Sequence, residues 1–275
     1  NIFALVLGAS SVLFSALLRL NILYQPNSLD VLCWTTFLFI LIKYFNTQNN
    51  KWFYAGMVLL ALGFLNKYNI IFLVAGLFPA LLLTGRSIFL NRHFYFSVLL
   101  FLLLILPNLI WQYTNNFPVY HHMQQLAETQ LVNVNRWDFL KDQLYFYIGS
   151  LFVILAGFYA LLFYPPFKKY GFFFWTMCFT LMIFTLLKAK SYYAMGLYPV
   201  YIAFGAVYLE MLMKSGWKRY PQPIALSIPV LFFIPMVQIL FPVKSPDYIL
   251  HHPEHYKKFG LLRWEDGKDY DIPQD

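Results

Sequence analysis

The sequence predicts an all-α protein whose helices cross a lipid bilayer several times. Of its 275 residues, 60% are hydrophobic and only 12% are charged, whereas a soluble domain carries about 25% charged residues. So few charges cannot coat a soluble surface of this size, and the remaining apolar surface must face lipid. Apolar runs also recur along nearly the whole chain. The fold class is therefore a polytopic transmembrane helix bundle.

Nine apolar runs are candidate spans, because a helix needs roughly 20 apolar residues, or about 17 at the short end, to cross a bilayer. They lie near 2–18, 31–46, 53–65, 69–85, 94–111, 144–164, 171–187, 195–213 and 223–241. The third run is short and is followed almost at once by the fourth, which predicts a tight hairpin. We expect a transmembrane bundle over 1–241 and a polar external tail over 242–275.

Basic residues predict which loops face the cytoplasm. One set of four short loops holds nine of them: Lys43, Lys51, Arg86, Arg92, Lys168, Lys169, Lys214, Lys218 and Arg219. The opposite set holds six before the tail: Arg19, Lys67, Arg136, Lys141, Lys188 and Lys190. The first set is expected in the cytoplasm, which puts the loop 112–143, the tail and every acidic residue except Glu210 on the other face. Basic residues scattered at the ends of the predicted helices explain the net charge of +8, so no nucleic-acid partner is predicted.

Asp30 and Lys67 are ionisable residues at the ends of apolar runs. A carboxylate at a membrane boundary is costly and often functional, but Asp30 could equally cap the second span, and the two roles are compatible. Lys67 stands among Asn66, Tyr68 and Asn69. It is either a lysine that snorkels to the interface or an ammonium that binds a phosphate at the membrane surface.

A second basic segment separates the seventh and eighth runs. Lys188 and Lys190 are followed by Tyr192 and Tyr193. Two cations and two phenols beside lipid would suit a lipid-linked phosphate, since the cations attract it and the hydroxyls donate hydrogen bonds. Interfacial anchoring is the alternative.

The long external loop carries His121, His122 and Glu128. Adjacent histidines on a helix point about 100° apart and share a metal poorly, so no metal site and no cofactor are predicted, although a divalent ion is conceivable. The loop is either solvated or an amphipathic helix on the membrane that begins after Phe117. The sequence contains no Walker A loop, Rossmann fingerprint, HExxH or nucleophile elbow.

Several segments resemble the dolichyl-phosphate-mannose–protein mannosyltransferase family and its bacterial aminoarabinose-transferase relatives, which are membrane glycosyltransferases of the C-type (GT-C) fold. The resemblance covers most of the chain. It is carried by the segments 25–30 (QPNSLD), 63–68 (GFLNKY), 107–112 (PNLIWQ), 116–118 (NFP), and 190–193 (KSYY) with Tyr198-Pro199.

The resemblance implies an enzyme that moves a hexosyl or pentosyl group from a polyprenyl-phosphate carrier to a lipid, glycan or protein acceptor. It implies a bacterial inner membrane with the active face outside the cytoplasm. Members of the family carry their catalytic base in a loop that would precede Asn1, so Asp30 would be an accessory acid. The bundle would lack its N-terminal spans, and the tail would begin a truncated soluble segment.

The expected site therefore has two sides. Lys67, Lys188, Lys190, Tyr192 and Tyr193 would bind the donor phosphate. The acceptor or sugar side would hold Asn27, His121, His122 and Glu128. A transporter or flippase and a non-catalytic membrane subunit are the alternative functions. A continuous polar path through the bundle would favour the former, and the absence of a basic cluster at an external groove would favour the latter.

Overall fold

A computed structural model describes residues 2–241, 243–258 and 260–273 of the protein. Within these ranges the chain is helical, and its β-structure is limited to an isolated bridge between Arg263 and Asp269. The all-α prediction is confirmed. The α-helices are α1 (Ile2–Leu13), α2 (Ala16–Ile22), α3 (Asn27–Thr47), α4 (Lys51–Asn66), α5 (Ile70–Thr84), α6 (Arg92–Thr114), α7 (Pro118–Thr129), α8 (Arg136–Tyr145), α9 (Leu151–Phe163), α10 (Phe172–Leu186), α11 (Tyr198–Leu212), α12 (Pro221–Leu240), α13 (Pro246–His251) and α14 (Pro253–Lys258).

Every predicted apolar run is helical, but the run 2–18 is broken between α1 and α2, and the helices differ in length. In the described chain four are long enough to span a membrane, namely α3, α6, Ser191–Leu212 and Gly216–Gln238. Two bent pairs, α1–α2 and α8–α9, raise the number to 6 if each pair is one span. The other three runs are α4, α5 and α10, with 16, 15 and 15 residues. A polytopic membrane protein is confirmed, with up to six full-length spans where the sequence predicted about nine.

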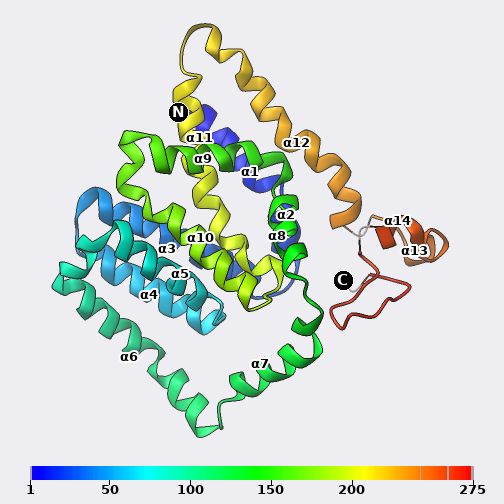
Figure 1. Ribbon diagram of the computed structural model, residues 1–275, viewed down its shortest axis with the longest axis horizontal. Coiled ribbons are helices and arrows are strands. Elements are labelled where there is room, and N and C mark those ends of the chain that lie inside the picture. Colours follow the sequence, from blue (N-terminus) through cyan, green and yellow to red (C-terminus); the bar gives the residue numbers. More distant parts are fainter. Residues whose placement is uncertain (1, 242, 259, 274–275) are drawn as a thin grey trace.

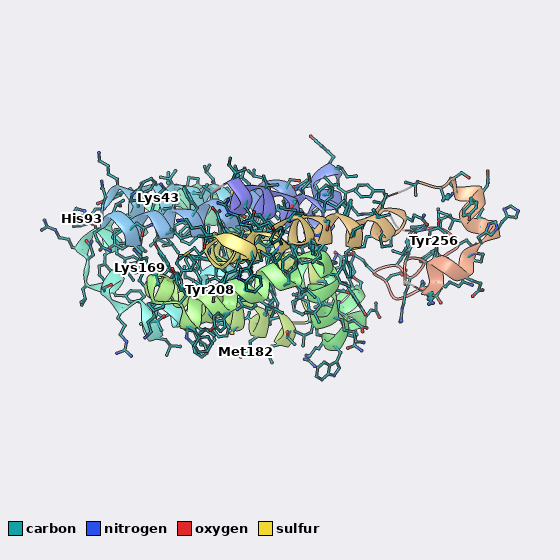
Figure 2. The ribbon with its side chains drawn as sticks, turned by 90° about the horizontal axis from the view of Figure 1, so that it is seen from above. Lys43, His93, Lys169, Met182, Tyr208 and Tyr256 are labelled. Carbon is teal, nitrogen blue, oxygen red and sulfur yellow. The ribbon has the colours of Figure 1, made fainter. Side chains whose placement is uncertain are left out.

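The bundle has two ends that carry different residues. Lys43, His93 and Lys169 lie at one end, while Tyr256 and the rest of the C-terminal segment lie at the other (Figure 2). We call the latter the tail end. The helices α6 and α12 lie at the periphery (Figure 1). Only 11% of the residues in the most apolar stretch of Arg92–Thr114 are buried, and 17% of those in the most apolar stretch of Gly216–Gln238. Such exposed apolar helices fit contact with lipid.

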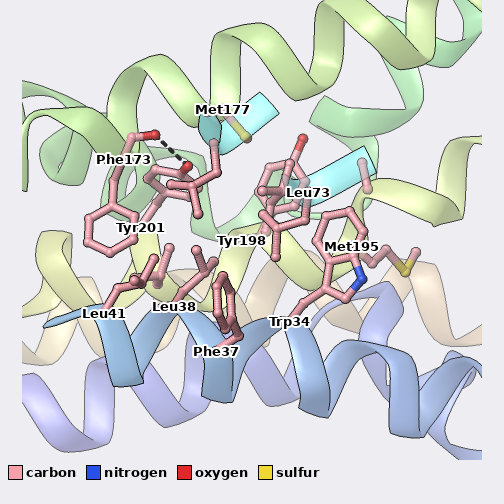
Figure 3. Packing of buried hydrophobic residues seen from close by; sticks show 14 of the residues in the cluster. Trp34, Phe37, Leu38, Leu41, Leu73, Phe173, Met177, Met195, Tyr198 and Tyr201 are labelled. Atoms are coloured by element: carbon pink, nitrogen blue, oxygen red, sulfur yellow. Dashed lines mark hydrogen bonds between the residues drawn. The ribbon is translucent and has the colours of Figure 1, made fainter. Parts of the chain in front are cut away.

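The core forms where α3, α5, α10 and α11 meet. Trp34, Leu38 and Leu73 are fully buried there, and the Tyr201 hydroxyl donates to the Phe173 carbonyl at 2.7 Å (Figure 3). A tyrosine within such a core needs this partner, because an unpaired hydroxyl is costly to bury. The core thus fixes α3 and α11, the two helices that begin at the candidate site.

The two bent pairs break beside each other. The α1–α2 pair bends by 64° and the α8–α9 pair by 61°. The Ala16 N–H donates to the Phe146 carbonyl at 3.1 Å, and the Ser150 hydroxyl donates to the Ser11 carbonyl at 3.0 Å. Each break therefore satisfies backbone groups that the other leaves without helical partners, as a membrane interior requires.

Candidate functional site

A cavity of about 460 Å³ opens beside these bends, and we call it the cationic cavity. It lies between α2, the start of α3, the turn from α4 to α5, and the 3₁₀ segment Ser191–Leu197. Its polar lining comes from six residues, Arg19, Gln25, Asn27, Lys67, Lys190 and Glu265, together with the phenol of Tyr192. Leu20, Leu23 and Met195 form part of an apolar wall.

Lys67 is held at the cavity by its position directly after α4. Its backbone N–H donates to the Gly63 carbonyl at 2.8 Å, and its side-chain Nζ donates to Asn27 Oδ1 at 2.7 Å. The ammonium lies 4.3 Å from the ring centroid of Tyr193 and 5.1 Å from that of Tyr192. Burial lowers the pKa of Lys67, and the nearby Asp30 carboxylate opposes this shift. Amide and aromatic partners hold the cation without neutralising it.

Asp30 lies near Lys67, whose ammonium its charge stabilises. The residue is buried, at 5% exposure. Its Oδ1 accepts from Trp34 Nε1 at 3.0 Å, and its Oδ2 accepts from Asn69 Nδ2 at 2.9 Å. The alternative that Asp30 caps α3 is therefore wrong, since both oxygens accept from side chains. Asp30 does not line the cationic cavity. Its carboxylate accepts a hydrogen bond from Asn69 and favours the charged form of Lys67.

Lys190 approaches from the opposite side of the cavity. It precedes the segment Ser191–Leu197, and its Nζ forms an ion pair with Glu265 Oε2 at 2.6 Å. Ser191 anchors this segment to α8, because its hydroxyl donates to Asp142 Oδ2 at 2.6 Å and its carbonyl accepts from Gln143 Nε2 at 3.0 Å. The position of Lys190 thus depends on α8.

The structure brings together four of the predicted site residues, Asn27, Lys67, Lys190 and Tyr192, at one cavity. Tyr193 contacts Lys67 but does not line the cavity. Lys188 lies in the turn after α10 and does not line the cationic cavity. His121, His122 and Glu128 are exposed on α7 and do not line the cationic cavity. Their predicted roles on the acceptor side gain no support from this placement.

Two charged lining residues, Arg19 and Glu265, were not predicted as site residues from the sequence. Arg19 donates to the Leu240 carbonyl and carries a charge inside an otherwise apolar stretch, which is a recognised signal of function. Glu265 lies in the polar tail among other acids, so nothing local distinguishes it. In the part of the chain that the structure describes, no three His, Cys, Asp or Glu residues form a group that could hold a metal ion.

The fold and the cavity define a polytopic membrane protein with three basic side chains gathered at one end of its bundle. Residues 1–111 match the model of a GT-C type family described as dolichyl-phosphate-mannose-protein mannosyltransferase. This match confirms the family resemblance over the part that carries Asn27, Asp30 and Lys67, and it indicates a membrane glycosyltransferase. No curated protein and no solved structure matches the chain.

Proposed function

We propose that the protein transfers a sugar from a polyprenyl-phosphate carrier to an acceptor, and that the cationic cavity holds the phosphate. The observation that carries this proposal is the convergence of Arg19, Lys67 and Lys190, from distant parts of the sequence, on one cavity. Among the described residues that line the cavity, these three cations are joined by one carboxylate, that of Glu265, so the formal charge of the lining is +2. Such an excess favours an anionic ligand.

The lining also suits an amphiphilic ligand. Apolar residues of α2 and Met195 face the same space as the three cations. A prenyl chain could lie along the apolar wall while its phosphate reaches Lys67 and Lys190. In the transition state, negative charge develops on the departing phosphate, and fixed cations would stabilise it. The prediction that this end of the bundle faces away from the cytoplasm, in a bacterial inner membrane, belongs to the same proposal.

The broken spans favour a second candidate, a transporter of lipid phosphates. Discontinuous helices frame the binding sites of many carriers, and both bent pairs lie at the cationic cavity. Both candidates place a phosphate in this cavity. The two functions differ in what happens to the bound lipid: a transporter releases it unchanged, whereas a transferase breaks the bond between sugar and phosphate.

Transfer by lysine variants tests the proposal. Membranes that contain the full-length protein are given radiolabelled polyprenyl-phosphate sugars, and release of the sugar from the lipid is followed. Lys67→Ala and Lys190→Ala should each slow release about 10- to 100-fold, since a hydrogen bond to a charged group contributes about 1.5–3 kcal/mol.

The matched control is Lys51→Ala, an exposed lysine at the opposite end of the bundle, which should leave release unchanged. Folding is checked by thermal unfolding in detergent. Normal release by both cavity variants would show that these lysines only anchor helices. A wild-type protein that moves labelled carrier lipid across vesicles without cleaving it would support the transporter.

A further inference from the structure

An apolar cavity of about 240 Å³ lies toward the end of the bundle that carries Lys43 and His93 (Figure 2), and we call it the apolar pocket. It is formed by α3, α4, α5, α6 and the 3₁₀ turn Arg86–Leu90. Apart from Gly56, its described lining consists of aliphatic, aromatic and methionine side chains, without a charged residue. Such a lining offers water few hydrogen-bond partners, so the pocket suits a hydrocarbon.

The pocket opens sideways from the bundle. Val74 and Phe78 on α5 and Leu102 on α6 line it and are exposed, whereas Phe53 and Leu60 on α4 line it and are buried. The outermost of these helices, α6, lies at the periphery (Figure 1). Exposed apolar side chains on a membrane helix face lipid, so the chains of the surrounding lipids have direct access to the pocket.

The length of the pocket matches one leaflet of a bilayer. Its lining on α4 extends from Trp52 to Leu60, which is about 12 Å along a helix axis. One leaflet supplies about 15 Å of hydrocarbon, half the thickness of the bilayer core. An acyl chain that enters at this end of the bundle would therefore fill the pocket without leaving its own leaflet.

Two arginines flank the 3₁₀ turn at the end of the pocket. Arg86 begins the turn, Arg92 begins α6 just after it, and Ile88 between them lines the pocket. Both arginines are exposed, and the described ion pairs involve neither of them. The Nε–H of Arg86 donates to the Leu82 carbonyl, which holds this guanidinium at the turn. Guanidinium groups bind phosphate oxygens through paired hydrogen bonds, so an anionic headgroup matches the turn.

We infer that the apolar pocket binds one acyl chain of an anionic phospholipid, whose headgroup phosphate lies between Arg86 and Arg92. A hydrocarbon cavity that is open to lipid, with two cations at its end, supplies both parts of a site for such a lipid. The bound lipid would join α5 to α4 and α6. It would thereby stabilise the hairpin of α4 and α5, whose opposite end carries Lys67. This inference is independent of the proposed function, and its failure would leave that function standing.

Lipid binding to the purified full-length protein tests the headgroup. The delipidated protein is mixed in detergent with phosphatidylglycerol or with phosphatidylcholine that has the same acyl chains, and bound lipids are counted by native mass spectrometry. One phosphatidylglycerol should bind about tenfold or more tightly than phosphatidylcholine, since each nearby cation favours an anionic lipid by about fivefold. It should also raise the unfolding temperature, as a ligand of the folded state does. Equal affinities for the two lipids would overturn the inference.

Arg86→Gln/Arg92→Gln tests the placement of the phosphate. The double variant should weaken binding of phosphatidylglycerol by about fivefold for each arginine removed and should leave binding of phosphatidylcholine unchanged. The matched control is Lys168→Gln/Lys218→Gln, which removes the same charge from exposed positions that do not line the pocket and should bind as wild type does. Equal weakening in the two double variants would show a general effect of charge and would contradict a headgroup site at this turn.

Val74→Phe tests the placement of the acyl chain, because the added ring would occupy the pocket. It should abolish tight binding of the one phosphatidylglycerol while the lipid-free protein unfolds at the temperature of its control. That control is Val58→Phe, since Val58 on α4 is exposed to the same degree, 40% against 38%, but does not line the pocket. Wild-type affinity in Val74→Phe would overturn the inference. Displacement of phosphatidylglycerol by equimolar polyprenyl phosphate would also overturn it, because the pocket would then bind the carrier.

Discussion

Asp30 and Lys67 differ in what their contacts leave available for a ligand. Both oxygens of Asp30 accept hydrogen bonds from buried side chains, so the carboxylate cannot reach an acceptor without breaking them. Lys67 instead lines the cavity, with Asn27 and two tyrosine rings as neighbours. We therefore treat Asp30 as a positioning residue that holds Asn69 and favours the charged form of Lys67.

Asp30→Asn tests this role. The amide would lose the charge that faces Lys67, and its NH₂ group would oppose either Trp34 or Asn69, each of which is a donor. The free energy of unfolding should fall by about 1–3 kcal/mol, the cost of a buried polar group left unsatisfied, measured by denaturant titration in detergent. In a double-mutant cycle with Lys67→Met, the two losses should not add, because the residues share a network. Additive losses would contradict the coupling.

The residues at the cavity were only partly accessible to prediction. Lys67, Lys190 and Tyr192 could be chosen because each interrupts or borders an apolar run, and the loops place them at one end. Glu265 could not be chosen, because its position at the cavity depends on a turn at Gly267 that packs against Asn133, more than a hundred residues away in the sequence. Lys188 and Lys190 look alike in sequence, and only the fold separates them.

At the scale of elements, α9 and α11 approach each other closely through two glycines. A Cβ on Gly205 would lie 1.8 Å from the Val153 carbonyl oxygen, and a Cβ on Gly157 would lie 2.3 Å from that of Tyr201. Small residues allow such backbone contact between membrane helices. This pair of helices supports the segment Ser191–Leu197, which immediately precedes α11 and carries Tyr192 to the cavity.

Gly205→Ala should therefore destabilise the bundle. An overpacked core site costs about 1–3 kcal/mol, and here the neighbour is backbone, which cannot swing away. The expected result is a lower unfolding temperature in detergent. The matched control is Gly8→Ala on α1, whose Cβ would meet only the Ala206 side chain at 3.7 Å. Equal unfolding temperatures for the two variants would show that α9 and α11 are not packed this closely.

Elements were the most predictable level of the structure, since each apolar run is helical. The breaks between α1 and α2 and between α8 and α9 were not predicted. The break between α1 and α2 consists of Phe14 and Ser15, so no proline or glycine marks it in the sequence. This break is instead stabilised by hydrogen bonds from Ala16 and Ser150 that join the α1–α2 pair to the α8–α9 pair. Such reciprocal bonds are tertiary, so hydropathy along the chain does not reveal them.

At the scale of the molecule, the bundle has two unlike ends. One end carries Lys43 and Lys169 (Figure 2), and the tail end carries the cationic cavity, whose lining includes Glu265 of the C-terminal segment. Sequence patterning predicted this division, because charge and loop length alternate along the chain. It could not predict that the tail completes the site, since the contact between Glu265 and Lys190 joins segments 75 positions apart.

The central claim is that the phosphate of a polyprenyl carrier binds between Arg19, Lys67 and Lys190. The most direct measurement is photolabelling with polyprenyl phosphate that carries a diazirine on the isoprene unit next to the phosphate, followed by mapping of labelled peptides. The account predicts label on α2 and on the segments that contain Lys67 and Tyr192, and loss of that label with excess unlabelled polyprenyl phosphate. Label confined to the lipid-facing α6 and α12, and insensitive to competition, would contradict it.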